Sequence, residues 1–144
     1  MKKLFIGSDV LLDLLLDREP FSEDTAILIE NSIESQVKLY TSILSIANMH
    51  YIIERLETKK KADSKIKKIL KIISIENAGQ TVIDKANKSK FKDFEDSIQN
   101  FCAVEASHEI LITRNTKDYK ESQLSIFTPK ENLAKIANDK SARY

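Results

Sequence analysis

Residues 4–16 read LFIGSDVLLDLLL, in which a short apolar run, a polar Gly-Ser-Asp segment and an apolar pattern at helical spacing follow one another. This pattern predicts a buried strand that runs directly into a helix. Ser8 or Asp9 is the expected helix N-cap, because both side chains accept hydrogen bonds from the free amides at a helix start. The same strand-then-helix step recurs further along the chain. It favours an α/β fold with a mostly parallel sheet covered by helices on both faces.

The period of the apolar residues predicts the other elements. Helices are expected at 22–35, 42–56, 59–71, 80–88, 91 or 95 to 107, and 129–136, and strands at 37–41, 74–76, 109–113 and 124–127. Together they form one expected domain over residues 1–137, followed by a polar tail at 138–144.

The composition suits one compact domain with its own core. The chain has 144 residues, of which 42% are hydrophobic and 31% charged, and its formal net charge is +1. A nearly neutral chain has no overall positive field, so contact with nucleic acid must come from a local patch or a bound metal. The single cysteine excludes an internal disulfide, and we find neither a signal-peptide pattern nor an apolar run of membrane-spanning length. A cytoplasmic location without membrane contact is therefore expected.

Acidic and polar side chains follow the predicted strands where ligands usually bind. In open parallel sheets, that place lies outside the carboxyl ends of the strands, where the strand order reverses. Hard oxygen ligands that converge there from distant parts of the chain suit Mg²⁺ or Mn²⁺. The sequence thus predicts a carboxylate metal site drawn from the residues after two strands and from one face of a helix start: Asp9, Asp93, Asp96, Asn100, Thr113, Asn115 and Asp118.

The same residues have structural interpretations that the sequence leaves open. Asp9 caps a helix equally well, and an acid at position 93 or 96 complements the dipole of its helix. Asn115 and Asp118 are also typical turn residues.

Other chemistries have less support. His50 lies on an apolar stripe, which is more typical of a core histidine than of a ligand, and neither it nor His108 has zinc-ligand spacing. Cys102 is expected to be a buried structural thiol. The sequence contains no Gly-rich phosphate loop, no Gly-x-Ser-x-Gly elbow and no Cys-x-x-Cys pair, so P-loop, serine-hydrolase and redox enzymes lose their main support.

Three segments resemble the PIN-domain family, which includes the VapC-like ribonucleases that act as toxins in bacterial toxin–antitoxin pairs. They are FIGSDVLLDLLLDREPF at 5–21, KDFED at 92–96 and ITRNTKDY at 112–119, and the resemblance spans about residues 2 to 137. It implies a three-layer α/β/α sandwich, an acidic pocket that holds Mg²⁺ or Mn²⁺, and metal-assisted hydrolysis of RNA phosphodiesters. It also implies an antitoxin partner and a homodimer.

The resemblance carries over to individual positions. Asp96 matches a metal-binding acid, Asp93 an additional acid of the same helix start, and Asp118 the late acid. Asn115 and Thr113 match the polar residues that organise the late turn, and Ser8 and Asn48 are expected to support the site. A solvated face is the default interpretation of the lysine-rich helix, although its lysines are also candidates for RNA contact: Lys60, Lys61, Lys65 and Lys68.

The chain departs from the family at two positions. Gly7 stands where the family usually has an aspartate, and Asn48 stands where related toxins often have glutamate. Three explanations remain open for Gly7: an inactivated form of a toxic nuclease, a natural pseudoenzyme, or a site that works with Asp9. We therefore expect a ribonuclease that is weakened or inactive, and the alternative is a PIN-fold module that binds RNA or protein without catalysis. A phosphate-accepting receiver domain has less support, because the acids that it needs after its strands are missing.

Overall fold

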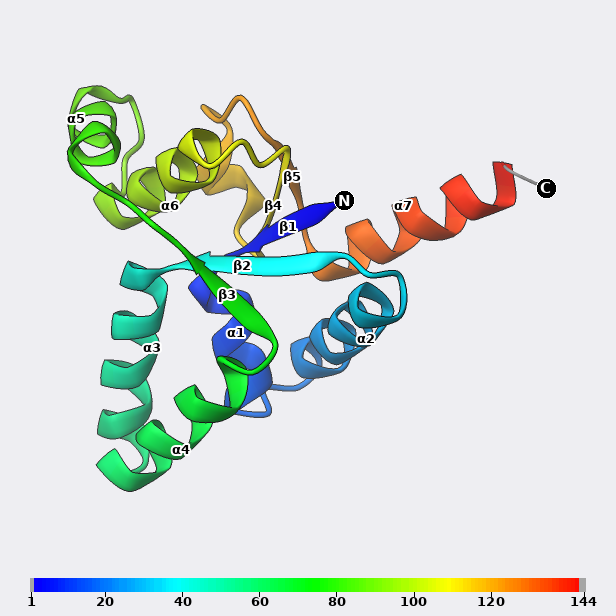
Figure 1. The fold of residues 1–144 in the computed structure, drawn as a ribbon, viewed down its shortest axis with the longest axis horizontal. Helices are drawn as coiled ribbons and strands as arrows, with labels where there is room; N and C mark the ends of the chain where they lie inside the picture. The colour runs from blue at the N-terminus through cyan, green and yellow to red at the C-terminus, as the bar shows by residue number, and fades with distance from the viewer. Residues whose placement is uncertain (1, 143–144) are drawn as a thin grey trace.

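The computed structural model describes residues 2–142, with side chains described through residue 136 (Figure 1). In chain order, its elements are β1 (Lys3–Ile6), α1 (Ser8–Leu15), α2 (Phe21–Glu34), β2 (Lys38–Ser42), α3 (Ile43–Leu56), α4 (Lys59–Ile69), β3 (Ile73–Glu76), α5 (Gln80–Lys88), α6 (Phe94–Glu105), β4 (Ile110–Ile112), a 3₁₀ turn η1 (Thr116–Tyr119), β5 (Ser125–Phe127) and α7 (Pro129–Ala142).

The five strands form one parallel sheet in the order β3-β2-β1-β4-β5. In the central strand, Phe5 lies between Tyr40 of β2 and Leu111 of β4. The chain builds β2 and β3 on one side of β1 and then returns to add β4 and β5 on the other. The strand order therefore reverses between β1 and β4, the place where α/β sheets open a crevice for ligands.

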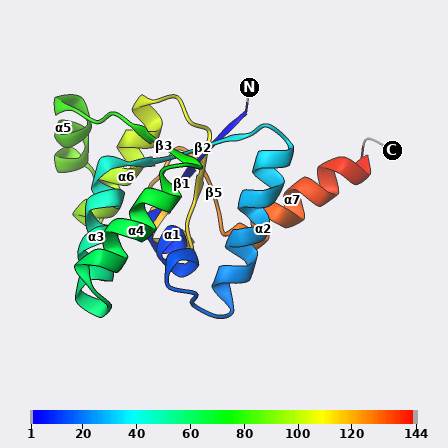
Figure 2. The same ribbon diagram turned by 60° about the horizontal axis from the view of Figure 1, so that its bottom comes forward.

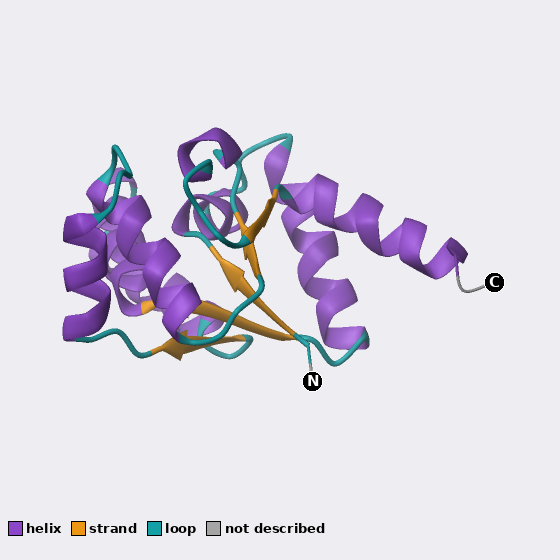
Figure 3. Cartoon of the chain, turned by 90° about the horizontal axis from the view of Figure 1, so that it is seen from above, coloured by secondary structure: helices purple, strands orange, loops and turns teal. Residues whose placement is uncertain are grey.

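Helices cover both faces of this sheet (Figures 1 and 2). Side chains alternate along a strand, so Leu4 and Ile6 of β1 face the layer formed by α1 to α4, whereas Phe5 faces α5 and α6. The α/β prediction and the expected three-layer sandwich are confirmed. Helix α7 packs against α2 and then extends away from the sheet toward the C-terminus (Figure 3).

Two predicted details differ from the structure. Gly7, not Ser8 or Asp9, is the N-cap of α1, and no side chain caps that helix. The reason is that the Asp9 carboxylate bonds to residues after β4 instead of to its own helix. Helix α7 continues to Ala142 instead of ending near Ile136, so the expected polar tail begins inside the helix, and its last two residues lie outside the described part of the chain.

Within residues 2–142, no helix combines the length and the apolar character needed to cross a membrane.

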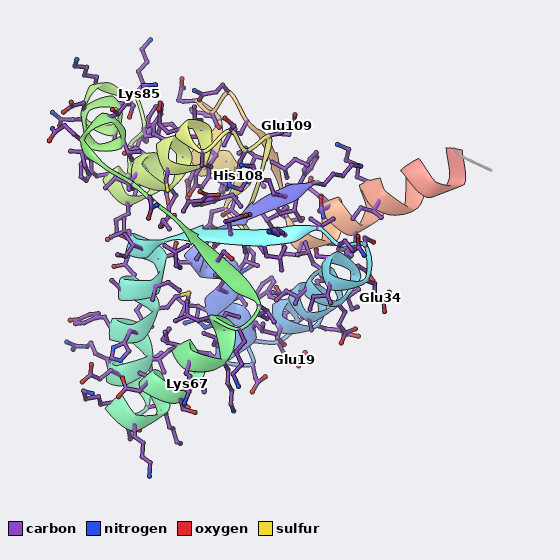
Figure 4. The ribbon with its side chains drawn as sticks, in the orientation of Figure 1. Glu19, Glu34, Lys67, Lys85, His108 and Glu109 are labelled. Atoms are coloured by element: carbon purple, nitrogen blue, oxygen red, sulfur yellow. The ribbon has the colours of Figure 1, made fainter. Side chains whose placement is uncertain are left out.

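A buried histidine lies on the α5–α6 side of the sheet. Figure 4 labels this residue, His108. Its ring packs edge-on against the rings of Phe5 and Tyr40, and its Nε2 lies 2.9 Å from Oε1 of Glu76. Among the described residues, none hydrogen-bonds its buried Nδ1. Burial lowers the pKa of His108 below its usual 6.5, and the nearby Lys3 acts in the same direction, although Glu76 opposes them.

This lowered pKa predicts a loss of stability in mild acid. The unfolded chain takes up a proton at His108 more readily than the folded chain does, so the stabilising contribution is present above pH 6.5 and is lost as the pH falls below it. We expect the free energy of unfolding to fall by up to about 1.4 kcal/mol per pH unit below pH 6.5, and His108→Phe to reduce this dependence. Urea unfolding at pH 7.5 and 5.5 measures it.

His108 and its Phe variant should be compared in chains that also carry Asp96→Asn. Asp96 titrates in the same pH range, and its protonation raises stability whereas protonation of His108 lowers it. An equal acid dependence with and without His108 would contradict the prediction.

Candidate active site at the carboxyl ends of β1 and β4

The ends of β1 and β4 are joined directly by main-chain and side-chain hydrogen bonds. The Gly7 amide donates to the carbonyl of Ile112 at 2.8 Å. Two residues further on, Oδ2 of Asp9 accepts hydrogen bonds from the Thr113 hydroxyl at 3.0 Å and from the Arg114 amide at 2.8 Å. The Asp9 carboxylate is thus held across the point where the two strands separate.

The start of α6 brings further acids to this crevice. Asp93 is the N-cap of α6, and its side chain accepts a hydrogen bond from the Asp96 amide at 2.9 Å. The half-buried carboxylate of Asp96 accepts a hydrogen bond from the Tyr119 hydroxyl at 3.3 Å. Asp118 precedes this tyrosine in η1, and its amide donates to the carbonyl of Asn115 at 3.0 Å.

Asp96 lies at the electrostatic centre of the cluster. Burial raises its pKa to about 6, and the charges of Asp93, Asp118 and Asp9 act in the same direction, whereas the hydrogen bond from Tyr119 acts in the opposite direction. Burial and the carboxylates of Asp96, Asp9 and Asp93 raise the pKa of Tyr119 far above its usual value, so its hydroxyl remains a donor at all physiological pH values. Asp9, Asp93 and Asp118, which the sequence also singles out, therefore lie near enough to Asp96 to raise its pKa.

This set of carboxylates fits an open magnesium-type site better than a closed metal cage. In the described part of the chain, no three acidic, histidine or cysteine side chains converge closely enough to enclose an ion. Mg²⁺ usually keeps several waters and needs only one or two protein carboxylates together with substrate phosphates. The charges of Asp93, Asp118 and Asp9 add to the burial that raises the pKa of Asp96, and a divalent cation would relieve this repulsion.

Gly7 determines how much charge β1 contributes to the crevice. Its backbone is extended, with φ −70° and ψ 156°, so other residues can adopt the same conformation. A Cβ atom at this position would lie 2.8 Å from Oδ1 of Asp9 and 3.2 Å from the carbonyl oxygen of Ile112. The Asp9 carboxylate thus covers the place where a side chain of residue 7 would emerge.

Polar side chains beside the acids connect α6 to the end of β2 and to α3. Nδ2 of Asn48 donates to Oε2 of Glu95 at 3.0 Å, and the Ser42 hydroxyl donates to Oε1 of the buried Gln99 at 2.7 Å. Asn48 thus contacts Glu95, the residue before Asp96, and the sequence patterns missed Glu95. Ser8 is half-buried between Gly7 and Asp9 at the start of α1.

Thr113 and Asn115 organise the turn after β4, as expected from the sequence. The Thr113 side chain donates to Asp9 and also accepts a hydrogen bond from the Asn115 amide at 3.1 Å. Asn100, in contrast, does not add an oxygen to the acidic cluster. It accepts a hydrogen bond from the Ser122 hydroxyl and donates to Gln123, so it supports the segment before β5.

A buried ion pair lies directly behind the acidic cluster and was missed by the sequence patterns. Asp13 of α1 is fully buried and accepts hydrogen bonds from the Arg114 guanidinium, one of them at 3.1 Å. A second arginine, Arg18, approaches Asp13 to 3.7 Å. The guanidinium of Arg114 also lies 4.0 Å from the centroid of the Phe21 ring. Arg114 thus has an anchored side chain, while its amide holds Asp9.

Two other sequence interpretations can now be assessed. His50 is not a core residue: its side chain is 30% exposed and lies 2.6 Å from Asp63 of α4, because its position faces the edge between α3 and α4. Cys102 is buried as predicted, and burial raises its pKa to about 11, which makes it a poor nucleophile.

Comparison with known proteins gives consistent results. Residues 3–117 match the family model described as a PIN domain. Ribonuclease VapC1 of Aquifex aeolicus (strain VF5) is 25% identical over 135 residues, which cover 90% of this chain and 92% of that protein.

Two solved complexes contain a chain of the same fold. The matching chain of VapBC-1 from nontypeable Haemophilus influenzae has a TM-score of 0.69 at 11% identity, covering 89% of this chain and 98% of its own length. The matching chain of VapBC2 from Rickettsia felis, solved bound to a DNA fragment from the promoter, has a TM-score of 0.65 at 14% identity. The match covers 87% of this chain and 96% of that chain.

Proposed function

Because the chain belongs to the PIN domain family, we propose that it is a metal-dependent ribonuclease of the VapC type whose activity is weakened by Gly7. The observation that carries this proposal is the position of Asp96 near Asp9, Asp93 and Asp118, at the edge of the sheet where the strand order reverses. We further propose that Asp93, Asp96 and Asp118 hold Mg²⁺ or Mn²⁺, with Asp9 as the contribution from β1. The matching chains in VapBC complexes support an antitoxin as protein partner, and we expect a homodimer, as the family resemblance implies.

In this proposal each residue has a defined task. Asp96 is positioned by the hydroxyl of Tyr119, which stays protonated. Asp9 is fixed by Thr113 and the Arg114 amide, so it cannot turn away from the crevice without losing two hydrogen bonds. When bound, the metal ion would neutralise phosphate charge and lower the pKa of an attacking water.

Asp96→Asn should make the chain more stable than the parent without metal and less stable than the parent with metal. The raised pKa means that the folded chain holds the Asp96 proton more tightly than the unfolded chain, so the ionised group opposes folding at neutral pH. In EDTA at pH 7.5 we expect Asp96→Asn to raise the free energy of unfolding by about 1–2 kcal/mol, a range that allows for solvent screening of a half-buried group.

In Mn²⁺ the parent chain should gain stability by binding the ion, and Asp96→Asn should gain little. Urea unfolding in both conditions measures this reversal. Asp84→Asn, which removes an exposed carboxylate on α5, is the matched control and should change stability by less than about 0.5 kcal/mol. A stabilisation by Mn²⁺ that is equal in the parent and in Asp96→Asn would contradict the proposed metal site.

The lysines of α4 are a proposed contact for RNA. Lys60, Lys61 and Lys68 are exposed, whereas Lys65 is half-buried and pairs with Glu57 at 2.6 Å. Log affinity for RNA falls as log salt concentration rises. Changing Lys60 and Lys68 to glutamate should make this fall less steep, reducing the magnitude of its slope by about 1–2, since each phosphate contact with a single strand contributes about 0.7. The control pair Lys38→Glu and Lys88→Glu changes net charge equally on other surfaces. If both pairs have the same effect, α4 does not contact RNA.

A PIN-fold module that binds RNA or protein without catalysis is the second candidate. It is favoured by Gly7 and by the absence, in the part of the chain that the structure describes, of three converging ligands. RNA affinity that is unchanged by EDTA, together with no cleavage in Mg²⁺ or Mn²⁺, would support this candidate over the nuclease.

A further inference from the structure

A cavity of about 380 Å³ opens beside the acidic crevice, where α2 and α7 begin. These two helices pack against each other, on the right in Figure 2. Phe21, Arg114 and Lys130 line the cavity together with two prolines, Pro20 and Pro129. Asp24 and Thr128 complete the lining. The cavity therefore combines an apolar wall with Lys130, Asp24 and an arginine whose charge is paired with Asp13.

The aromatic wall is exposed and its support is rigid. Phe21 is 40% exposed, and one part of its ring is covered by the Arg114 guanidinium at 4.0 Å. That guanidinium cannot shift freely, because it is hydrogen-bonded to the fully buried carboxylate of Asp13. An aromatic ring that is held in place and partly open to solvent is a ready surface for stacking.

Arg114 links the cavity to the acidic cluster. The main-chain amide of Arg114 donates to Asp9, while the side chain of the same residue lines the cavity. A strand of RNA with one phosphate at the carboxylates would therefore have a neighbouring nucleotide within reach of Phe21. Lys130, which also lines the cavity, adds a positive charge that suits a phosphate.

We propose that this cavity binds one unpaired base of single-stranded RNA next to the phosphate that is cleaved, with the base stacked on Phe21. The inference rests on the proposed ribonuclease function and adds a subsite to it. Stacking on an aromatic side chain requires an unstacked base, so the site selects single-stranded over duplex RNA. The exposed ring of Phe21 beside the exposed Lys130, which can contact a neighbouring phosphate, favours a nucleotide over an apolar peptide segment.

The chain contains no tryptophan, so the fluorescence of a single tryptophan placed in the cavity reports only on the cavity. In Phe21→Trp, we expect a single-stranded RNA oligonucleotide to quench the tryptophan emission, with the same dissociation constant as the fluorescence anisotropy of the labelled RNA. Duplex RNA of the same sequence should not quench it. Tyr51→Trp is the control, because Tyr51 is 58% exposed on α3 and lies outside the cavity. The titration is run in Mn²⁺, with a gel to verify that the RNA stays intact.

A second pair of variants tests stacking without tryptophan. Phe21→Ala should weaken binding of single-stranded RNA about 10-fold, and Phe21→Leu, which keeps an apolar side chain, should weaken it nearly as much. Both should leave duplex binding unchanged.

The possible results separate the subsite from the function on which it rests. A rise in anisotropy without quenching of the tryptophan in Phe21→Trp would overturn the subsite and leave RNA binding intact. No change in anisotropy would overturn both the subsite and an RNA substrate. Quenching by the C-terminal peptide of a coexpressed antitoxin, but not by RNA, would assign the cavity to a protein partner and overturn the proposal.

Discussion

Gly7→Asp should bind Mn²⁺ at least about 10-fold more tightly than the parent chain and cleave RNA at least about 100-fold faster, because the new carboxylate supplies charge to the metal and to the transition state. The position can accept the change. Its backbone is extended and lies in a region open to all residues. Calorimetry with Mn²⁺ and single-turnover cleavage of a labelled RNA measure the two effects.

The new side chain must displace the far end of Asp9. A Cβ at residue 7 lies 2.8 Å from Oδ1 of Asp9, so the Asp9 carboxylate must turn and strain its hydrogen bonds to Thr113 and Arg114. The same Cβ lies 3.2 Å from the Ile112 carbonyl, which must move by a few tenths of an ångström. Crowding of this kind costs about 1 kcal/mol of stability. Gly7→Ala is the matched control, since it adds the same Cβ without a carboxylate and should gain neither metal affinity nor activity. Equal gains in both variants would show that backbone rigidity, and not charge, limits the chain.

Asp13→Ala should lower the free energy of unfolding by about 2–4 kcal/mol, the largest stability effect that we expect from one side chain near the site. Asp13 is fully buried and is the partner of Arg114, which is 28% exposed, so its removal leaves a cation with only partial access to water. The change should also release Arg114, loosening both the amide that holds Asp9 and the guanidinium over Phe21. Urea unfolding and Mn²⁺ titration follow these two consequences.

Two controls distinguish the ion pair from simple loss of packing. Arg18→Ala removes the more exposed and more distant arginine, and should cost less than about 1 kcal/mol. The double change Asp13→Leu and Arg114→Met leaves no unpaired charge between those two positions, so it should recover part of the stability lost in Asp13→Ala. If Arg18→Ala proves as destabilising as Asp13→Ala, the pairing with Arg114 is not the main source of stability.

The sequence predicted the elements of this fold well because apolar periodicity is a local property. Each strand and helix follows from which residues repeat at a spacing of two or of three to four, and α5 at Gln80–Lys88 has the predicted bounds. The N-cap of α1 was predicted wrongly because it depends on a distant contact. Asp9 was an ideal cap by local rules, but Thr113 and Arg114, more than 100 residues away in sequence, bind its carboxylate instead.

The sequence predicted the acids of the candidate site but not the contacts that hold them. The topological rule placed Asp9, Asp96 and Asp118 at one edge of the sheet, since each follows or faces a strand end. The contacts that tune the site were not predictable, because they pair residues with no shared local pattern. The Tyr119 hydroxyl on Asp96 and the Arg114 guanidinium on Asp13 are of this kind. Tyr119 had a possible signal in its position directly after the late acid, but a tyrosine there is equally consistent with the core.

The most direct test of the acidic cluster as a catalytic site is cleavage of a single-stranded RNA in Mn²⁺ by three proteins side by side: the parent chain, Gly7→Asp, and Gly7→Asp combined with Asp96→Asn. We predict weak or undetectable cleavage by the parent, strong cleavage by Gly7→Asp that EDTA abolishes, and none by the double variant. Cleavage that survives the loss of Asp96, or a Gly7→Asp protein that binds no Mn²⁺ and cuts no RNA, would contradict the account.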